Sequence, residues 1–185
     1  MERPAFREIH DLLKSYGVTV AMGGDTHDFE YYQERYRREG GDATMHHFVN
    51  GGGGAYLSMG TALSWPDRPP VDDWAFYPSR QELLSKTDRL TPWWKWPAWV
   101  WVKQYRAWPF AVEWLSAAFD YNVSPFFQSF VVVSVESSRN QLRILPYTAS
   151  GRMTWAELQH SPALRGSKDQ EFVEFVLPMS NSDHQ

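Results

Sequence analysis

Apolar residues recur at three- to four-residue spacing from Pro4 to Tyr16, and this spacing predicts an amphipathic helix. Pro4 suits the first turn of such a helix, and Gly17 suits its C-terminal end. The five residues Val18–Met22 then predict a buried strand. A helix packed beside a buried strand is a unit of α/β folds, so we expect an α/β sandwich or a doubly wound sheet.

The clearest β pattern lies in the second half of the chain. Phe126–Val135 is rich in Phe and Val, Ser137–Asn140 has turn composition, and Gln141–Thr148 reads as a returning strand. These three segments predict a β-hairpin. Met153–Leu158 predicts a helical turn, and the weak alternation of Phe172–Leu177 predicts an edge strand.

A glycine-rich segment follows the first predicted strand. Gly40–Asp42 predicts a turn, and Met45–Val49 predicts a strand that ends in Asn50 and the four glycines Gly51–Gly54. Such a run suits a backbone that passes very close to another group. It forms either a tight turn beneath a site or a loop that contacts phosphate. It lacks the Lys-Ser/Thr of a P-loop, so nucleotide binding of that kind is not expected.

Tryptophan is concentrated in one part of the chain. Nine of the ten tryptophans lie between Trp65 and Trp114, in a segment that begins rich in proline and includes a predicted short helix, Ser79–Asp88. The pattern favours an aromatic helical subdomain. A lid over an active site and a surface for a partner or a membrane interface are the alternatives, because Trp and Tyr favour such interfaces.

Composition narrows the function classes. The formal net charge is −4, which gives no electrostatic reason to expect nucleic acid or an anionic membrane as a partner. The chain has no cysteine, so disulfides and thiolate metal sites are excluded. The N-terminus has no apolar signal-peptide core, and no stretch of about 18 uncharged apolar residues exists. A cytoplasmic location is therefore the default expectation.

Ligand-type side chains follow the first predicted strand directly. After Gly23 and Gly24 come Asp25, His27 and Asp28. Sites in open α/β sheets form beyond the carboxyl ends of strands, so this loop is the main candidate site. The alternative is a structural loop in which Asp25 and Asp28 cap turns.

Two adjacent histidines, His46 and His47, lie in the next predicted strand, where they should face opposite sides. One of them would then face the candidate site. A structural histidine is the alternative for each.

The segments GGDTHDFEYY and HHFVNGGGGAYLS resemble the C-terminal part of calcineurin-like metallophosphoesterases. His27 matches the second histidine of that family's Gly-His-x-His motif, and Asp25 stands where the first would be. The resemblance implies the C-terminal portion of a metallophosphoesterase-type α/β sandwich with a Trp-rich, mainly helical insertion. It divides the chain into residues 1–58 (core), 59–123 (insertion) and 124–185 (closing hairpin, edge strand and polar tail).

The resemblance also implies a site and a substrate class. His27 and Asp25 would bind divalent metal ions, namely Mn, Fe or Zn, and the substrate would be a phosphate ester. Other residues would support the ligands or form the floor of the site: Asp28, Glu30, His47, Asn50, Gly51 and Gly52.

Several family motifs are absent from the sequence. The Asp-x-His, Gly-Asp-x-x-Asp and Gly-Asn-His motifs, which precede Gly-His-x-His in the family, do not occur. We therefore expect a hydrolase fragment with little or no activity alone, which needs a missing N-terminal half to complete a dinuclear centre. The alternatives are a non-catalytic binding module that uses the Trp-rich insertion, and one half of a split enzyme.

Overall fold

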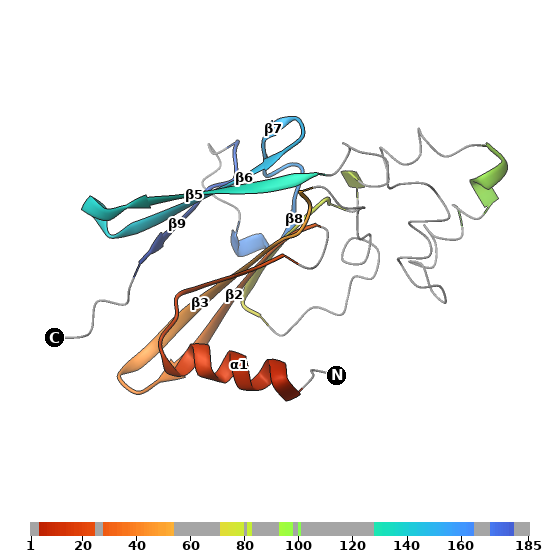
Figure 1. Cartoon of the computed structure of the whole chain (residues 1–185). Coiled ribbons are helices and arrows are strands. Elements are labelled where there is room, and N and C mark those ends of the chain that lie inside the picture. Colours follow the sequence, from red (N-terminus) through yellow and green to blue (C-terminus); the bar gives the residue numbers. More distant parts are fainter. Residues whose placement is uncertain are drawn as a thin grey trace.

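The computed structural model describes residues 4–24, 28–53, 71–79, 81–82, 93–97, 100, 128–164 and 171–179. These residues form two β-sheets and one α-helix, α1 (Pro4–Ser15). Figure 1 shows α1 beside β2 and β3, on the side away from the sheet that contains β5, β6 and β9. The strands are β1 (Val20–Gly23), β2 (Phe29–Arg38), β3 (Gly41–Asn50), β4 (Asp73–Tyr77), β5 (Ser129–Glu136), β6 (Gln141–Thr148), β7 (Gly151–Arg152), β8 (Gln159–His160) and β9 (Phe175–Pro178).

The first sheet has the strand order β1-β3-β2-β4-β8. Strands β2 and β3 form a long antiparallel hairpin, and Gly40 and Gly41 turn between them with φ values of 105° and 140°. These angles favour glycine, because a side chain is rarely tolerated there. Strand β1 pairs with β3 in parallel, so both strands end at the same edge of the sheet, where Gly23 pairs with Val49.

The second sheet consists of β5, β6, β7 and β9. Strands β5 and β6 pair along their full length, from Ser129↔Thr148 to Glu136↔Gln141. The turn between them ends at Asn140, which has a left-handed φ of 52°. The predicted hairpin is thus confirmed. The predicted edge strand is also present as β9, which begins at Phe175 and pairs with β6.

The core lies between the two sheets. Strands β2, β3 and β4 present one set of alternate side chains toward the second sheet, as expected for a period of two. Tyr31 and Phe175 meet across this interface with ring centroids 4.4 Å apart, and Phe48 lies 5.2 Å from Phe175. The buried core residues are Phe29, Tyr31, Phe48, Ala75, Tyr77, Ile144, Met153, Leu158, Val173, Phe175 and Leu177.

Helix α1 ends as its sequence predicts. Gly17 has a φ of 65°, its N–H donates to Lys14 O at 3.0 Å, and Val18 N–H donates to Leu13 O at 3.1 Å. This pair of bonds is the Schellman motif, which satisfies carbonyl groups at a helix end. Among the described side chains of its predicted apolar stripe, only Leu13 is half-buried and the other three are exposed. Ile9, Leu12 and Tyr16 are 58%, 55% and 76% exposed.

The predicted fold class is wrong. The described residues are mostly β-strand in two sheets, with one helix, and do not form an α/β sandwich with a mainly helical insertion. Only one described strand pair, β1 with β3, is parallel, and all the others are antiparallel. Strand β1 is half-buried to exposed rather than buried.

Strand β4 departs most clearly from the predicted fold. It lies within the predicted insertion, yet it pairs with β2 in the first sheet, and all its residues are buried. The segment Met153–Leu158, predicted as a helical turn, forms no helix but contains one turn, in which Glu157 N–H donates to Thr154 O at 3.1 Å. Met153 enters the core, and Thr154 forms an isolated bridge to Phe172.

Most of the Trp-rich segment lies outside the described residues, as do most of the predicted helix Ser79–Asp88, the glycine Gly54 and the polar tail. The part that is described includes a short 3-10 helix, η1 (Trp93–Lys95). In the described parts of the chain, no helix combines the length and the apolar character that crossing a bilayer requires.

Candidate functional site

The edge where the parallel strands β1 and β3 end is the location that the sequence predicts for a site. A Cβ atom on Gly24 would lie 3.4 Å from the carbonyl oxygen of Asn50. The backbone N–H of Gly51 donates to the carbonyl oxygen of Asp28 at 3.2 Å. The residues on both sides of segment 25–27 are therefore held against the end of β3. We call Gly24, Asp28 and residues 50–52 the β1/β3 edge.

The second sheet closes over this edge at Ser129. The backbone N–H of Ser129 donates to Gly52 O at 3.3 Å, and its hydroxyl donates to Asn50 Oδ1 at 3.1 Å. A Cβ atom on Gly52 would lie 2.6 Å from Ser129 Oγ, which is too close for a side chain. Gly52 therefore has a structural reason to be glycine, in keeping with the tight-turn interpretation of the glycine run.

The structure brings together only some of the predicted site residues. Asp28 is buried at the β1/β3 edge, where its carbonyl oxygen accepts a hydrogen bond from Gly51. Glu30 is also buried, and its Oε2 accepts a hydrogen bond of 2.6 Å from the Tyr32 hydroxyl. Burial raises the pKa of Tyr32, and the adjacent Glu30 raises it further. The two predicted metal ligands, Asp25 and His27, lie outside the described residues.

The donor chemistry of residues 25–28 suits a divalent cation, because it combines two carboxylates with an imidazole. The number of donors is too small for two metal ions, each of which takes several ligands. Within the described part of the β1/β3 edge, no three His, Asp or Glu side chains are close enough together to hold a metal ion. A dinuclear centre would need donors from a further segment.

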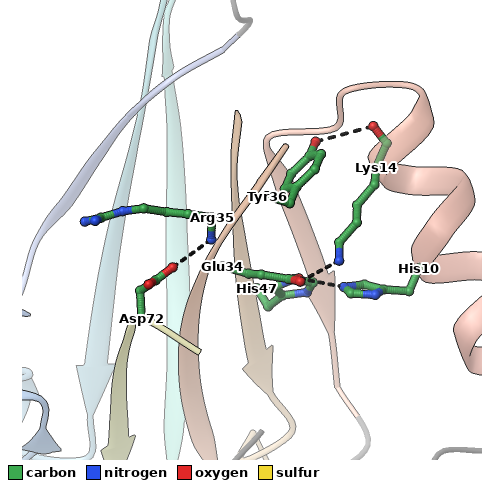
Figure 2. Close-up of polar contacts among 7 residues, drawn as sticks. All are labelled: His10, Lys14, Glu34, Arg35, Tyr36, His47 and Asp72. Atoms are coloured by element: carbon green, nitrogen blue, oxygen red, sulfur yellow. Dashed lines mark hydrogen bonds and ion pairs between the residues drawn. The ribbon is translucent and has the colours of Figure 1, made fainter. Parts of the chain in front are cut away.

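Another group of polar side chains lies between α1 and the first sheet. Glu34 Oε2 is 2.9 Å from His10 Nε2 and 3.7 Å from His47 Nε2, while Lys14 Nζ forms a short bond to Glu34 Oε1. Figure 2 shows the carboxylate of Glu34 facing the helix residues His10 and Lys14, with His47 beside it. We call these four residues the Glu34 cluster.

The positions of these side chains follow from the pairing of the elements. His10 and Lys14 are four residues apart on α1, so they lie on one face of the helix. In the hairpin, His47 pairs with Tyr32, and Glu34 pairs with Met45. The side chains of these four strand residues therefore project from the same face of the β2–β3 hairpin. Lys14 also accepts a hydrogen bond at its carbonyl oxygen from the Tyr36 hydroxyl, at 3.4 Å.

Backbone contacts fix the other side of β2. The N–H of Arg35 donates to Asp72 Oδ2 at 2.8 Å, and the N–H of Asp72 donates to Gln33 O at 3.0 Å. Strand β2 is thus held by β3 on one side and by Asp72 and β4 on the other (Figure 2). The Glu34 side chain therefore projects from a rigid element.

The electrostatic environment keeps Glu34 ionised and His47 neutral. Partial burial alone would raise the pKa of Glu34, but the hydrogen bond from Lys14 and the adjacent His10 outweigh it, and the pKa is lowered. Burial lowers the pKa of His47, and the neighbouring His10 lowers it further, against the opposing effect of Glu34. The cluster thus presents a carboxylate and an unprotonated imidazole near neutral pH.

His46 and His47 face opposite sides of β3, as predicted. His47 joins the Glu34 cluster, whereas His46 Nδ1 lies 2.9 Å from the Tyr31 hydroxyl on the core side. Burial, followed by the charge of His47, lowers the pKa of His46 to about 4. His46 is thus a neutral structural histidine under physiological conditions, and neither histidine belongs to the described β1/β3 edge.

The sequence interpretation missed His10, Lys14 and Glu34 as candidate site residues. The spacing of His10 and Lys14 was visible in the sequence, but their partner Glu34 is identified only by the register of β2 and β3. Comparison of the chain with protein-family models, with curated proteins and with solved structures finds no match.

Proposed function

We propose that the chain supplies part of the metal-binding site of a metal-dependent phosphate-ester hydrolase. The observation that carries this proposal is the convergence at the β1/β3 edge: Gly24 and Asp28, which flank Asp25 and His27, both lie against the end of β3. The described residues on both sides of the motif thus lie at the edge where the parallel strands β1 and β3 end.

The residues of this edge would have distinct roles. His27 would bind a divalent metal ion through its imidazole, and Asp25 would bind a metal ion or orient a water molecule through its carboxylate. Residues 50–52 would form the backbone floor, since Gly24 and Gly52 already bring neighbouring chain segments into close contact there. Bound divalent ions would supply Lewis-acid stabilisation of phosphoryl oxygens and a hydroxide at neutral pH.

The remaining ligands of a dinuclear centre would come from a further polypeptide segment. This follows from the number of donors at residues 25–28, and from the absence of the family's other ligand motifs in the sequence. Alone, the chain would bind metal weakly and hydrolyse phosphate esters slowly or not at all.

A second candidate function is a non-catalytic interaction module, which the exposed tryptophans favour. Trp93, Trp94 and Trp96 are 85%, 61% and 55% exposed, and tryptophan is enriched at binding surfaces. A monomer that unfolds cooperatively in EDTA and binds no Mn²⁺ would favour this second function over the first.

Metal selectivity tests the hydrolase proposal. Asp25→His restores the first histidine of the Gly-His-x-His motif, so competition dialysis should show a shift in preference from Mn²⁺ toward Zn²⁺. His27→Ala should abolish binding at this site, whereas His184→Ala, which changes a histidine outside the motif, should leave it intact. An unaltered Mn²⁺/Zn²⁺ preference in Asp25→His together with unaltered binding in His27→Ala would refute the assignment.

A further inference from the structure

Helix α1 contacts the first sheet through the polar side chains of His10 and Lys14, and Leu13 between them is half-buried. The apolar stripe of Ile9, Leu12 and Tyr16 faces solvent in the described structure, while His10 and Lys14 point toward the sheet. Surface helices normally bury their apolar face. Docking of α1 through polar groups therefore requires strong polar interactions between the helix and the sheet. The Glu34 cluster contains the polar side chains that lie between them.

We propose that His10, Glu34 and His47 bind one transition-metal ion of the Zn²⁺ type, which links α1 to the β2–β3 hairpin. The three side chains come from three elements, so an ion bound by all of them would cross-link the helix and both strands. The site is separate from the β1/β3 edge and does not depend on the proposed hydrolase function.

The geometry is close to that of a tetrahedral site. With metal–ligand bonds of about 2.0–2.1 Å, two ligand atoms of a tetrahedron stand roughly 3.3 Å apart. The distances from Glu34 Oε2 to the Nε2 atoms of His10 and His47, 2.9 and 3.7 Å, lie on either side of this value. One ligand atom from each residue lies within 4.8 Å of the others. Only small side-chain movements would be needed to accept an ion.

The ligand set matches known zinc chemistry. Two histidines and one glutamate are a ligand combination found in zinc sites that keep a fourth position for water. The side chains of His10, Glu34 and His47 are 34%, 22% and 24% exposed. Water can thus reach the fourth position, while the ligands are held by secondary structure on three sides.

Lys14 donates a hydrogen bond to the other carboxylate oxygen of Glu34, Oε1. Its bond to Glu34 Oε1 leaves Oε2 directed at the two imidazoles. Ligating carboxylates are commonly held by a second hydrogen bond of this kind. The positive charge of Lys14 also opposes a nearby cation, so it should weaken binding without changing the ligand geometry.

The test is a titration of the metal-free full chain with Zn²⁺ and with Co²⁺ as a spectroscopic substitute. One ion should bind, give the visible absorption of tetrahedral Co²⁺, and raise the melting temperature by roughly 5–10 °C at a hundredfold excess over Kd. His10→Ala and His47→Ala should each lose the absorption and the thermal shift. His27→Ala and His184→Ala should keep both, which separates this site from the proposed hydrolase site.

Lys14→Gln distinguishes a metal site from a simple ion-pair network. The glutamine amide keeps a donor for Glu34 Oε1 but removes the charge, so Zn²⁺ should bind about three- to tenfold more tightly. Circular dichroism of the metal-free variants shows whether each one is folded, and Glu34→Gln provides a further ligand variant if one of the histidine variants does not fold. Absence of binding to the folded wild-type chain, or binding that persists in both histidine variants, would overturn the proposal.

Discussion

The imidazole rings of His10 and His47 stand with their centroids 5.5 Å apart, although one belongs to α1 and the other to β3. Both Nε2 atoms approach the same carboxylate oxygen of Glu34. This arrangement joins the helix to the sheet on the face opposite the inter-sheet core. The stability of helix docking should therefore depend on the ionisation of Glu34 and on any cation that the cluster binds.

Glu34→Gln should lower the free energy of unfolding of the metal-free protein by about 1–2 kcal/mol at neutral pH. The folded-state pKa of Glu34 is lowered, so its carboxylate stabilises the fold above the unfolded-state pKa of about 4.3. That stabilisation is lost as pH falls through the folded-state value. Urea unfolding in EDTA should show a clear difference from wild type at about pH 7 and a smaller one at about pH 3.

The matched control for this change is Glu39→Gln, because Glu39 is exposed in the turn between β2 and β3. It should change the free energy of unfolding by less than about 0.5 kcal/mol at either pH. A Glu34→Gln variant whose deficit is the same at neutral and acid pH would contradict the role of the ionised carboxylate.

His46→Gln should reduce the pH dependence of stability between about pH 6.5 and pH 4. The unfolded chain protonates this histidine near 6.5, but burial holds its pKa at about 4 in the folded state, so stability falls as pH falls through this interval. After allowance for the partial exposure of His46, the loss of unfolding free energy across this interval is on the order of 1 kcal/mol. Urea unfolding at several pH values measures it, and His184→Gln should retain the wild-type dependence.

Gly52→Ala should destabilise the protein by about 1–3 kcal/mol, because the added Cβ would lie 2.6 Å from Ser129 Oγ. Gly53→Ala is the matched control, since no atom lies within 4 Å of a Cβ built there. Thermal denaturation of both variants checks the prediction. Adding Ser129→Gly should restore only part of the stability, as the backbone nitrogen of Ser129 is also close, at 3.1 Å.

Phe175→Ala should be the most destabilising of the proposed changes, at about 3–5 kcal/mol. Phe175 packs against Tyr31, Phe48 and Trp155, and so connects β9 to the first sheet. Val176, the next residue, faces away and is 49% exposed, so Val176→Ala should cost far less. Equal losses of unfolding free energy in the two variants would mean that the core is not located between the sheets.

Local signals in the sequence predicted the elements that local interactions define. Gly17 ends α1, and the turn at Ser137–Asn140 joins two strands whose composition is strongly β-forming. Strand β2 was not recognised, because aromatic and charged residues occur on both of its faces: Tyr31 packs in the core, and Glu34 binds α1. Strand β4 was missed because it follows a proline-rich segment.

The fold class was wrong for a related reason. One helix followed by one strand suggested repeated α/β units, yet β1 has a single parallel partner and the rest of the pairing is antiparallel. The β1/β3 edge was predictable, because glycines and polar residues follow two strands that end together. The Glu34 cluster was not, because it depends on register and on the side of the sheet that α1 covers.

The most direct test of the proposed function is metal content measured in a His47→Ala background, which removes the Glu34 cluster as a metal site. In equilibrium dialysis with enough Mn²⁺ in the buffer to fill a weak site, elemental analysis should find bound metal in the His47→Ala chain and a sharp reduction when His27→Ala is added. Equal metal content in the two proteins would contradict the assignment of the β1/β3 edge as a metal-binding site.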